Sequence, residues 1–320
     1  MKRIGVLTSG GDAPGMNACV RAVVRMGAYK GFEVFGIERG YDGLIAGDIK
    51  QLGPRDVSGT IQRGGTFLRT ARSEAFQTKD GFRRAVDMLE NFKIEGLVVI
   101  GGNGSLTGAL GLKKAGVKVV GLPGTIDNDL AYTDYTIGFD TAVNTALYAI
   151  SNVRDTSAAH ERVTIIEVMG RECGDIAVYS GLTGGAEIIL VPEEPVDLGE
   201  ICRTLIESRN KGKASSIIVK AEGVDIDSNT LDDEITKRTG LDVKVAILGY
   251  IQRGGTPTAS DRMLASILGA KAVELLDEGI SGVAVGTVGG DVVWPELGKA
   301  LKMKKKTVAP LFDLAKILAL

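Results

Sequence analysis

The sequence predicts an α/β protein with parallel strands, divided into two domains. Short apolar runs alternate with amphipathic stretches, as in chains where strands and helices follow one another. Glycine-rich segments follow several of these runs, which is typical of ligand-binding loops at the edge of a parallel sheet. The chain has 320 residues, 44% of them hydrophobic, enough for the cores of two domains of ordinary size.

Composition and charge exclude several classes of protein. A formal net charge of -2 argues against nucleic-acid binding dominated by the phosphate backbone, and no run approaches the length of a membrane span. The amino terminus lacks the apolar core of a signal peptide, so we predict a cytoplasmic protein. Cys19, Cys173 and Cys202 are widely spaced, without a CxxC pair, and are expected to be small core residues or bystanders. The one histidine, His160, predicts a helix-end or packing residue.

The amino-terminal elements form a strand, a glycine loop and a helix. Residues 2–8 predict a buried strand, residues 17–29 a helix and residues 33–38 the next strand. Gly10 and Gly11 leave room for a ligand to approach the backbone, and the N–H groups at a helix start favour anions. This order predicts a phosphate site, although its glycine spacing matches neither of the standard nucleotide-binding motifs.

Arginines near this loop have two interpretations. Arg21 and Arg25 lie one helical turn apart and can clamp a phosphate together, although solvated arginines are the commoner outcome. Residues 61–72 are rich in glycine and arginine and too polar for a core. Arg72 is therefore a candidate for stabilising developing negative charge.

A second glycine loop belongs to a βαβ unit. Residues 96–100 predict a strand, residues 106–114 a helix and residues 117–121 a returning strand, with the sequence GGNGS between the first two. Right-handed crossovers place the carboxyl ends of parallel strands at one edge of the sheet. We therefore expect both glycine loops and the loop after residue 121 to share one crevice.

That third loop carries two carboxylates. Pro123 and Gly124 are expected to end regular structure just before Asp127 and Asp129. Asp127 can accept a proton from a sugar hydroxyl while Asp129 holds Mg²⁺, a division of labour common in phosphoryl transfer. The alternative is an Asx-type turn with no catalytic role.

The second half of the chain continues the alternation. We predict helices over residues 140–154 and 198–211, and strands over residues 163–168, 186–191, 216–219 and 243–248. Lys302, Lys304, Lys305 and Lys306 predict a solvated basic patch.

Four segments together resemble bacterial ATP-dependent 6-phosphofructokinases. They are residues 7–17, 123–129, 169–171 and 252–255, and the likeness covers nearly the whole chain. The resemblance implies two Rossmann-like, three-layer α/β lobes with mainly parallel sheets and the active site between them. It places residues 1–138 plus about 251–305 in an ATP-binding lobe, and residues 139–250 plus about 306–320 in a fructose-6-phosphate-binding lobe.

The same resemblance implies a reaction in glycolysis. MgATP would donate its γ-phosphoryl group to O1 of fructose 6-phosphate, with Asp127 as base, Thr125 beside it, and Arg72 and Arg171 as charge stabilisers. Asp129 and Asn103 would lie near Mg²⁺. The ATP site would comprise Gly11, Arg72, Ser73, Gly102, Asn103, Gly104 and Ser105.

The sugar-phosphate site implied by the resemblance draws on two copies of the chain. It would comprise Thr125, Ile126, Asp127, Arg162, Met169, Gly170, Arg171, Glu222, Lys244, Tyr250, Ile251, Gln252 and Arg253. Arg162 resembles an arginine that reaches the 6-phosphate in the adjacent subunit, which implies at least a dimer; the family implies a homotetramer.

Three departures from the family pattern keep alternatives open. Asn103 replaces an acid, Tyr250 a histidine and Lys244 an arginine, which changes the charge near Mg²⁺ and the contacts to phosphate. Gly104 resembles the ATP-using branch rather than the pyrophosphate-using one. The alternatives are a nucleotide and sugar-phosphate sensor and a pyrophosphate-dependent phosphofructokinase.

The chain also carries more basic groups than an active site needs. The resemblance maps them to an ADP or phosphoenolpyruvate effector site at a subunit interface, in which Glu187 can hold Mg²⁺. The predicted set is Arg21, Arg25, Arg55, Arg154, Gly185, Glu187, Lys211 and Lys213. The alternative is scattered, solvated charge, with Glu187 and Glu222 as ordinary exposed acids.

Overall fold

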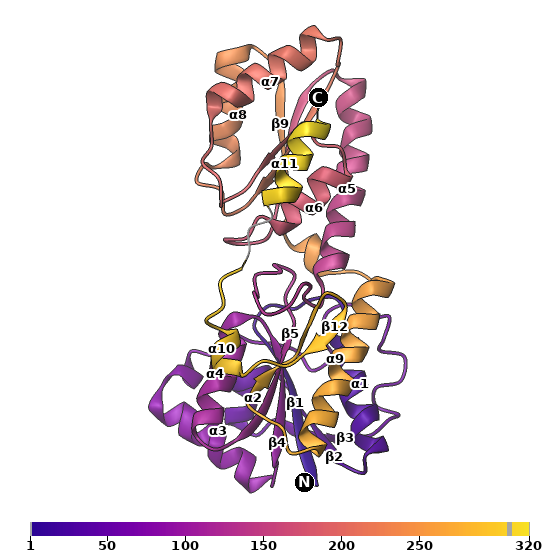
Figure 1. Cartoon of the computed structure of the whole chain (residues 1–320), viewed down its shortest axis with the longest axis vertical. Coiled ribbons are helices and arrows are strands. Elements are labelled where there is room, and N and C mark those ends of the chain that lie inside the picture. Colours follow the sequence, from indigo (N-terminus) through magenta and orange to yellow (C-terminus); the bar gives the residue numbers. More distant parts are fainter. Residues whose placement is uncertain (1, 306–308, 320) are drawn as a thin grey trace. The chain divides into compact units, whose positions relative to one another are not determined.

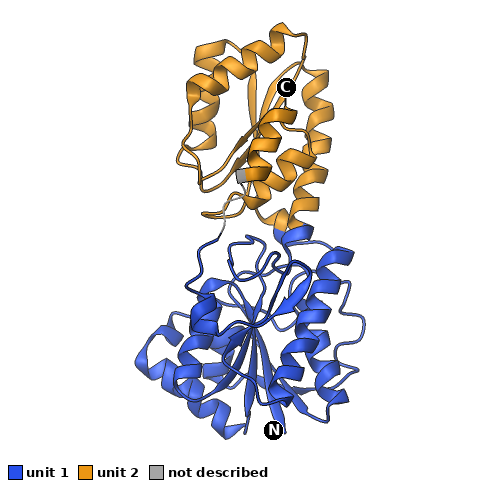
Figure 2. Ribbon diagram, in the orientation of Figure 1, with its two compact units in different colours: residues 1–141, 253–305 blue, residues 142–252, 306–320 orange. Residues whose placement is uncertain are grey.

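The computed structural model describes residues 2–305 and 309–319 and divides the chain into two compact units (Figure 2). Unit 1 consists of residues 1–141 and 253–305, and unit 2 of residues 142–252 and 306–320. The chain passes from unit 1 to unit 2 within helix α5 (Phe139–Ala159). Lys306, predicted to belong to the basic patch, lies outside the described residues.

Unit 1 is built on a six-stranded sheet in the order β10-β5-β4-β1-β2-β3. All neighbouring strands pair in parallel except β2 and β3, which are antiparallel. The strands are β1 (Arg3–Ser9), β2 (Glu33–Ile37), β3 (Ile49–Leu52), β4 (Gly96–Gly101), β5 (Lys118–Pro123) and β10 (Val283–Ala284).

Helices cover both faces of this sheet (Figure 1). Helices α1 (Met16–Tyr29) and α9 (Ala259–Asp277) pack on one face and on each other, where Gly269 allows the backbone of α1 to approach closely. The other face carries α2 (Gly40–Ala46), α3 (Lys79–Asn91) and α4 (Asn103–Lys114), whose buried side chains form one core with alternate residues of β1, β2, β4 and β5.

The remaining elements of unit 1 are short. They are the 3-10 helix η1 (Ala75–Gln77), the antiparallel hairpin of β11 (Gly286–Val288) and β12 (Asp291–Val293), and helix α10 (Leu297–Ala300).

Unit 2 contains a four-stranded, wholly parallel sheet in the order β7-β8-β6-β9. Its strands are β6 (Val163–Val168), β7 (Ile188–Leu190), β8 (Ser216–Ala221) and β9 (Val243–Ile247). The helices are α5, α6 (Asp175–Thr183), α7 (Leu198–Asn210), α8 (Ser228–Thr239) and α11 (Ala309–Leu318). The 3-10 helix η2 (Gly249–Arg253) follows β9, and within it the chain returns to unit 1. Asp197 and Asp227 cap α7 and α8 by accepting from backbone N–H groups in their first turns.

The predicted α/β class with mainly parallel sheets is confirmed, and the differences from the sequence lie at element ends. Helix α4 begins at Asn103 rather than residue 106, because the carbonyl of Gly102 already accepts the N–H of Leu106. Strand β5 continues through Pro123, which pairs with Gly101 at the end of β4. Helix α5 extends to Ala159, and β7 is shorter than the predicted residues 186–191.

Other sequence predictions concern burial. All three cysteines are buried, with no disulfide among the described residues, and His160 is exposed immediately after α5, as expected for a helix-end residue. Among the described residues, no helix is both long and apolar enough to cross a membrane.

Candidate active site

Three parallel strands of unit 1 end side by side, as the sequence predicts. Ser9 at the end of β1 pairs with Gly101 of β4, and Gly101 pairs with Pro123 of β5. The two glycine loops and the aspartate loop therefore start from one edge of the sheet. In open α/β sheets this edge is where ligands bind.

Glycines keep this edge open to a ligand. A Cβ at Gly10 would lie 3.1 Å from Oγ of Ser105, and one at Gly102 would lie 3.6 Å from Cβ of Thr125. Residues of the first, second and third loops therefore approach one another closely. Side chains at these glycines would fill space that a phosphate group can occupy.

The arginine-containing segment lies against the first glycine loop. The hydroxyl of Thr70 donates to the carbonyl of Gly10 at 2.8 Å, and the N–H of Gly10 points to the carbonyl of Ala71 at 3.5 Å. Arg72 follows directly and is exposed, while Ser73 accepts the N–H of Phe76 at 3.1 Å. The structure thus brings the backbone at Arg72 and Ser73 close to the first glycine loop.

Asn103 and Gly104 form the start of helix α4 and are both exposed. Nothing lies within 4 Å of a Cβ built at Gly104. Ser105 is buried, and its carbonyl accepts the hydroxyl of Tyr41 at 2.6 Å, which fixes the first turn against unit 1. The first N–H groups of a helix have no partner within the helix, so an exposed first turn favours an anion.

The aspartate loop is closed by its own hydrogen bonds. Asp127 is 1% exposed, and its N–H donates to Oγ1 of Thr125 at 3.2 Å. Between the two carboxylates, Asn128 adopts a positive φ of 52° and accepts the N–H of Thr136 at 3.0 Å through its amide oxygen. Asn128 thus makes the turn. The Asx-turn alternative accounts for Asn128 and leaves the burial of Asp127 unexplained.

One oxygen in this loop is suited to a cation. Oδ1 of Asp129 is buried and has no hydrogen-bond partner among the described residues, so a bound Mg²⁺ would satisfy it. No cluster of three or more His, Cys, Asp or Glu side chains suited to a metal is found in the described part of the chain. The residues therefore fit a metal that takes most of its ligands from phosphates and water.

Sequence reasoning missed a lysine at the aspartate loop. Lys305, predicted to be part of a solvated patch, donates to the carbonyl of Asn128. Lys302 and Lys304 are exposed, as predicted. No local signal distinguishes Lys305 from its neighbours, because the contact joins distant parts of the chain.

The predicted sugar-phosphate residues of unit 2 fall into two groups. Met169, Gly170 and Arg171 follow β6, and one oxygen of Glu222, which follows β8, accepts the N–H groups of Gly170 at 3.2 Å and Arg171 at 2.9 Å. The buried amide of Gln252 accepts the N–H of Met169 at 3.2 Å. These residues lie together at the carboxyl edge of the sheet.

The second group lies at the opposite edge. Arg162 immediately precedes β6, and Lys244 pairs with the second residue of β6. Nζ of Lys244 lies 2.6 Å from the carboxylate of Asp242, and Nε of Arg162 lies 3.8 Å from it. The hydrogen bond from Lys244 lowers the pKa of Asp242 below its usual value.

Three further predicted residues belong to η2, in which the chain passes from unit 2 back to unit 1. Tyr250 and Ile251 are exposed, and Arg253 belongs to unit 1. Its guanidinium donates to the carbonyl of Asp12 at 3.2 Å, within the first glycine loop. Arg253 therefore lies with the predicted ATP-binding residues, although the family resemblance assigns it to the sugar-phosphate site.

The predicted effector residues come from both units. In unit 2, Glu187 is buried, with Nζ of Lys213 2.6 Å and Nη1 of Arg154 3.7 Å from its carboxylate. Arg154 also donates to the carbonyls of Gly184 and Gly185, both at 2.7 Å. Glu187 is therefore no ordinary exposed acid. Lys211 is exposed directly after α7.

In unit 1, the predicted effector residues are Arg21 and Arg25 on α1 and exposed Arg55 after β3. Partial burial, and secondarily the charge of Arg25, lower the pKa of Arg21. A side chain held in this way favours an anionic partner that would neutralise the pair.

Each unit is an α/β structure with a mainly parallel sheet, and unit 1 carries glycine loops and a buried aspartate at the carboxyl edge of its sheet. These features define a protein that binds phosphate groups. More narrowly, the chain belongs to the phosphofructokinase family, since the family model described as Phosphofructokinase matches residues 3–276. ATP-dependent 6-phosphofructokinases of Clostridium tetani and Clostridium novyi are each 54% identical over 319 residues, with 100% of both chains covered.

Solved structures agree with this assignment. Phosphofructokinase from Saccharomyces cerevisiae superposes with a TM-score of 0.90 at 36% identity, covering 100% of this chain and 48% of the yeast chain, so this chain spans about half that length. Pyrophosphate-dependent phosphofructokinase from Marinobacter aquaeolei gives a TM-score of 0.85 at 22% identity, over 96% of this chain and 86% of the other. That second likeness concerns the fold alone.

Proposed function

We propose that this protein is an ATP-dependent 6-phosphofructokinase of glycolysis, working in the cytoplasm. The observation that carries the proposal is the 54% identity to ATP-dependent 6-phosphofructokinases over the full length of both chains. The buried Asp127 and the glycine-lined edge of unit 1 support it, because phosphoryl transfer needs a base and a place for phosphates.

In the proposed mechanism, Asp127 accepts the proton of the O1 hydroxyl of fructose 6-phosphate as O1 attacks the γ-phosphorus of ATP. The bond between the γ-phosphorus and the β,γ-bridging oxygen breaks, and ADP leaves with that oxygen. Thr125 orients Asp127 through its hydroxyl, which accepts the Asp127 N–H at 3.2 Å. Arg72 and Arg171 stabilise the charge that develops on the transferring group. Bound Mg²⁺, held by Asp129 with Asn103 near it, would neutralise phosphate charge.

In this proposal, different loops bind the two substrates. The ATP phosphates lie on the glycine loops and the first turn of α4, where free N–H groups and the absence of side chains favour them. The sugar phosphate lies on the backbone turn at Gly170 and Arg171, which Glu222 holds, with Ile126 at the reacting end.

A second copy of the chain completes the sugar-phosphate site in the proposal. Arg162 and Lys244 are separated from Arg171 by the length of β6, roughly 20 Å for six residues, so one small substrate cannot contact both groups within one chain. The two basic residues are therefore offered to a neighbouring copy. We infer at least a dimer, and a tetramer by analogy with the family.

We further propose that the basic groups around Glu187, together with Arg21, Arg25 and Arg55, bind ADP or phosphoenolpyruvate as effectors. The burial of Glu187 between Arg154 and Lys213 supports a built site, because it costs free energy to bury a carboxylate and its partners hold it in place.

A coupled assay with each phosphoryl donor tests the main proposal. Fructose 6-phosphate should be phosphorylated with MgATP far faster than with pyrophosphate. Efficient turnover with pyrophosphate alone would reject ATP as donor. Binding of both ligands without product, even at high enzyme concentration, would instead favour a sensor, an alternative motivated by Asn103, Tyr250 and Lys244.

A further inference from the structure

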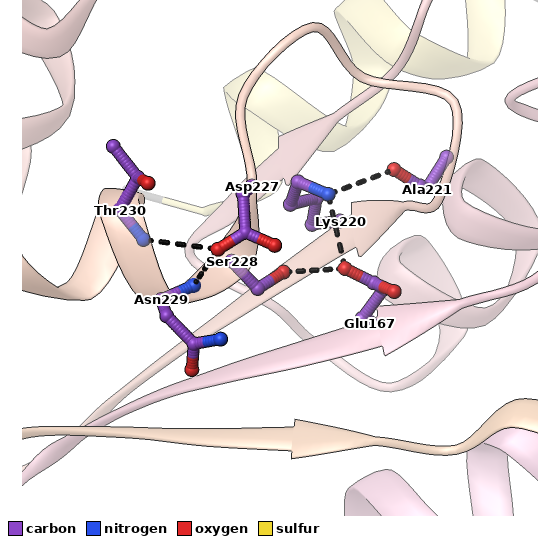
Figure 3. A network of polar contacts seen from close by, with 7 residues as sticks. All are labelled: Glu167, Lys220, Ala221, Asp227, Ser228, Asn229 and Thr230. Carbon is purple, nitrogen blue, oxygen red and sulfur yellow. Dashed lines mark hydrogen bonds and ion pairs between the residues drawn. The ribbon is translucent and has the colours of Figure 1, made fainter.

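A lysine is buried near the carboxyl end of β8, one of the two central strands of the unit 2 sheet. Lys220 on β8 is 1% exposed, and its ammonium lies 3.1 Å from Oε2 of Glu167 on β6 and 3.4 Å from the carbonyl of Ala221 (Figure 3). The same carboxylate oxygen accepts the hydroxyl of Ser228 at 2.5 Å. A buried ion pair of this kind rarely adds net stability over well-packed apolar side chains. Its placement is therefore more informative than its energy.

The network of Glu167, Lys220 and Ser228 lies next to the proposed sugar-phosphate loop, near the carboxyl ends of β6 and β8. Glu167 and Lys220 are paired neighbours in the β6–β8 ladder, and Val168 and Ala221 form the next pair. Beyond that pair both strands end, and Glu222 donates its N–H to the carbonyl of Val168 at 2.8 Å. The ion pair thus joins the second-last residues of both strands, one pair before the loop of Gly170 and Arg171 begins.

Glu167 also binds residues at both ends of the connection between β8 and α8. The chain leaves β8 after Ala221, makes the connection that contains Glu222, and enters helix α8 at Ser228 (Figure 3). Lys220 stands before this connection and Ser228 after it, and both bind the same oxygen of Glu167. One carboxylate therefore fixes both ends of the connection that positions Glu222.

The turn that Glu222 holds is conformationally demanding. Gly170 has a φ of 133° and Arg171 a φ of 52°, a conformation that a residue with a side chain rarely adopts. A Cβ at Gly223 would lie 2.0 Å from the carbonyl of Arg171, so the two loops pack without spare room. A small displacement of Glu222 therefore weakens the two hydrogen bonds that keep this turn in place.

We propose that Glu167, through Lys220 and Ser228, is a positioning residue for the sugar-phosphate loop. It touches no substrate; it holds the connection so that the carboxylate of Glu222 meets the N–H groups of Gly170 and Arg171. The proposal rests on the proposed function for the identity of the substrate. The arrangement of the loop is independent of that identity.

Full-length variants test it by kinetics. Glu167→Gln and Lys220→Met should each raise the KM for fructose 6-phosphate by about tenfold, because a displaced loop binds the sugar phosphate poorly, with the KM for ATP unchanged. Lys237→Met, at an exposed lysine in the last turn of α8, is the matched control and should change neither constant. The double variant Glu167→Gln/Lys220→Met should lie closer to wild type than Lys220→Met alone, since it leaves no unpaired buried charge.

A measurement without substrate separates this inference from the proposed function. Hydrogen exchange at the Gly170 and Arg171 amides should accelerate about tenfold in Glu167→Gln and Lys220→Met and stay unchanged in Lys237→Met. Ser228→Ala removes only the hydrogen bond from Ser228 to Glu167 and leaves the ion pair of Glu167 with Lys220. It can therefore be measured in their place if the other variants fail to fold. Unchanged exchange in the folded variants would overturn the inference, whatever substrate the wild-type enzyme uses. Faster exchange in an enzyme inactive on fructose 6-phosphate would reject only the proposed substrate.

Discussion

The guanidinium of Arg253 fills the space beside Gly11 that a side chain would need. A Cβ built at Gly11 would lie 2.6 Å from Nη1 of Arg253, and the same guanidinium donates to the carbonyl of Asp12 at 3.2 Å. Gly11 belongs to the proposed ATP site, and the family resemblance assigns Arg253 to the sugar-phosphate site. We therefore expect the first glycine loop to lie near both substrates.

Gly11→Ala should consequently impair both substrates at once. Gly11 does not have a positive φ, so alanine fits the backbone, and the methyl group displaces only the mobile end of Arg253. We expect the KM values for ATP and for fructose 6-phosphate to rise several-fold, with a thermal midpoint close to wild type. Steady-state kinetics with each substrate varied in turn measure this. A rise for ATP alone would show that the contact with Arg253 does not matter for the sugar phosphate.

Asp127→Ser should remove the proton acceptor and leave the loop in place. The loop is closed by hydrogen bonds of Asn128 and Thr136, so it does not depend on the Asp127 carboxylate alone. We expect kcat to fall by about 10²- to 10⁴-fold with little change in either KM. Unaltered turnover would reject the role of Asp127 as the base.

Features of this site that depend on neighbouring residues in the sequence can be predicted, and contacts between residues far apart in the sequence cannot. The glycine loops, the parallel strands before them and the aspartate loop are local patterns, and the structure brings all three to one edge as expected. The contacts of Arg253 with Asp12 and of Lys305 with Asn128 join residues far apart in the chain, and no local pattern encodes them.

Burial of charge was equally hard to predict. A lysine inside a short apolar run reads as a strand residue that faces solvent, yet Lys220 is buried because Glu167 on the neighbouring strand pairs with it. The sequence alone also allows Glu187 to be an ordinary exposed acid, whereas Arg154 and Lys213 make its burial possible. In both cases the partner comes from another element, so burial follows from the tertiary fold.

Glu296 gives unit 1 a pH-dependent contribution to stability. The hydrogen bond from Lys113, followed by the backbone N–H groups of Gly298 and Lys299, lowers the pKa of Glu296 from 4.5 to about 2. A carboxyl whose pKa is depressed by folding stabilises the folded state above its unfolded pKa and loses that effect as the pH falls from about 4.5 towards 2. Glu296→Gln should therefore lower the thermal midpoint at pH 7, and the difference from wild type should shrink below pH 4.5. A difference independent of pH would contradict this ion pair.

The proposed effector site predicts a loss of regulation without a loss of catalysis. Arg21→Ala/Arg25→Ala removes two basic groups of α1, outside the loops proposed to bind substrates. An effector that binds one state preferentially shifts sugar-phosphate affinity, and removing its ligands removes the shift. We expect basal turnover to stay within about twofold of wild type, while ADP and phosphoenolpyruvate no longer move the fructose 6-phosphate saturation curve. A curve that still shifts as in wild type would place the effector elsewhere.

The separation of Arg162 from Arg171 predicts that two inactive variants restore activity when mixed. Arg162→Ala removes the residue proposed to act in a neighbouring copy, and Asp127→Ser removes the proposed base of a chain's own site. If the site is shared between two copies, a hybrid of the two variants has one site with both groups intact. Random pairing in an equal mixture then leaves about a quarter of all sites complete.

Each variant alone should be strongly impaired, and mixing after dissociation and reassociation should recover up to about a quarter of wild-type activity. Lys237→Met mixed with Asp127→Ser is the matched control. This mixture should be as active as a mixture of wild type with Asp127→Ser, since Lys237 is exposed and belongs to neither group of predicted sugar-phosphate residues. If Arg162→Ala and Asp127→Ser recover nothing on mixing while the control mixture forms and works, Arg162 does not act in a neighbouring site. Its distance from the sugar-phosphate loop would then exclude it from substrate binding altogether.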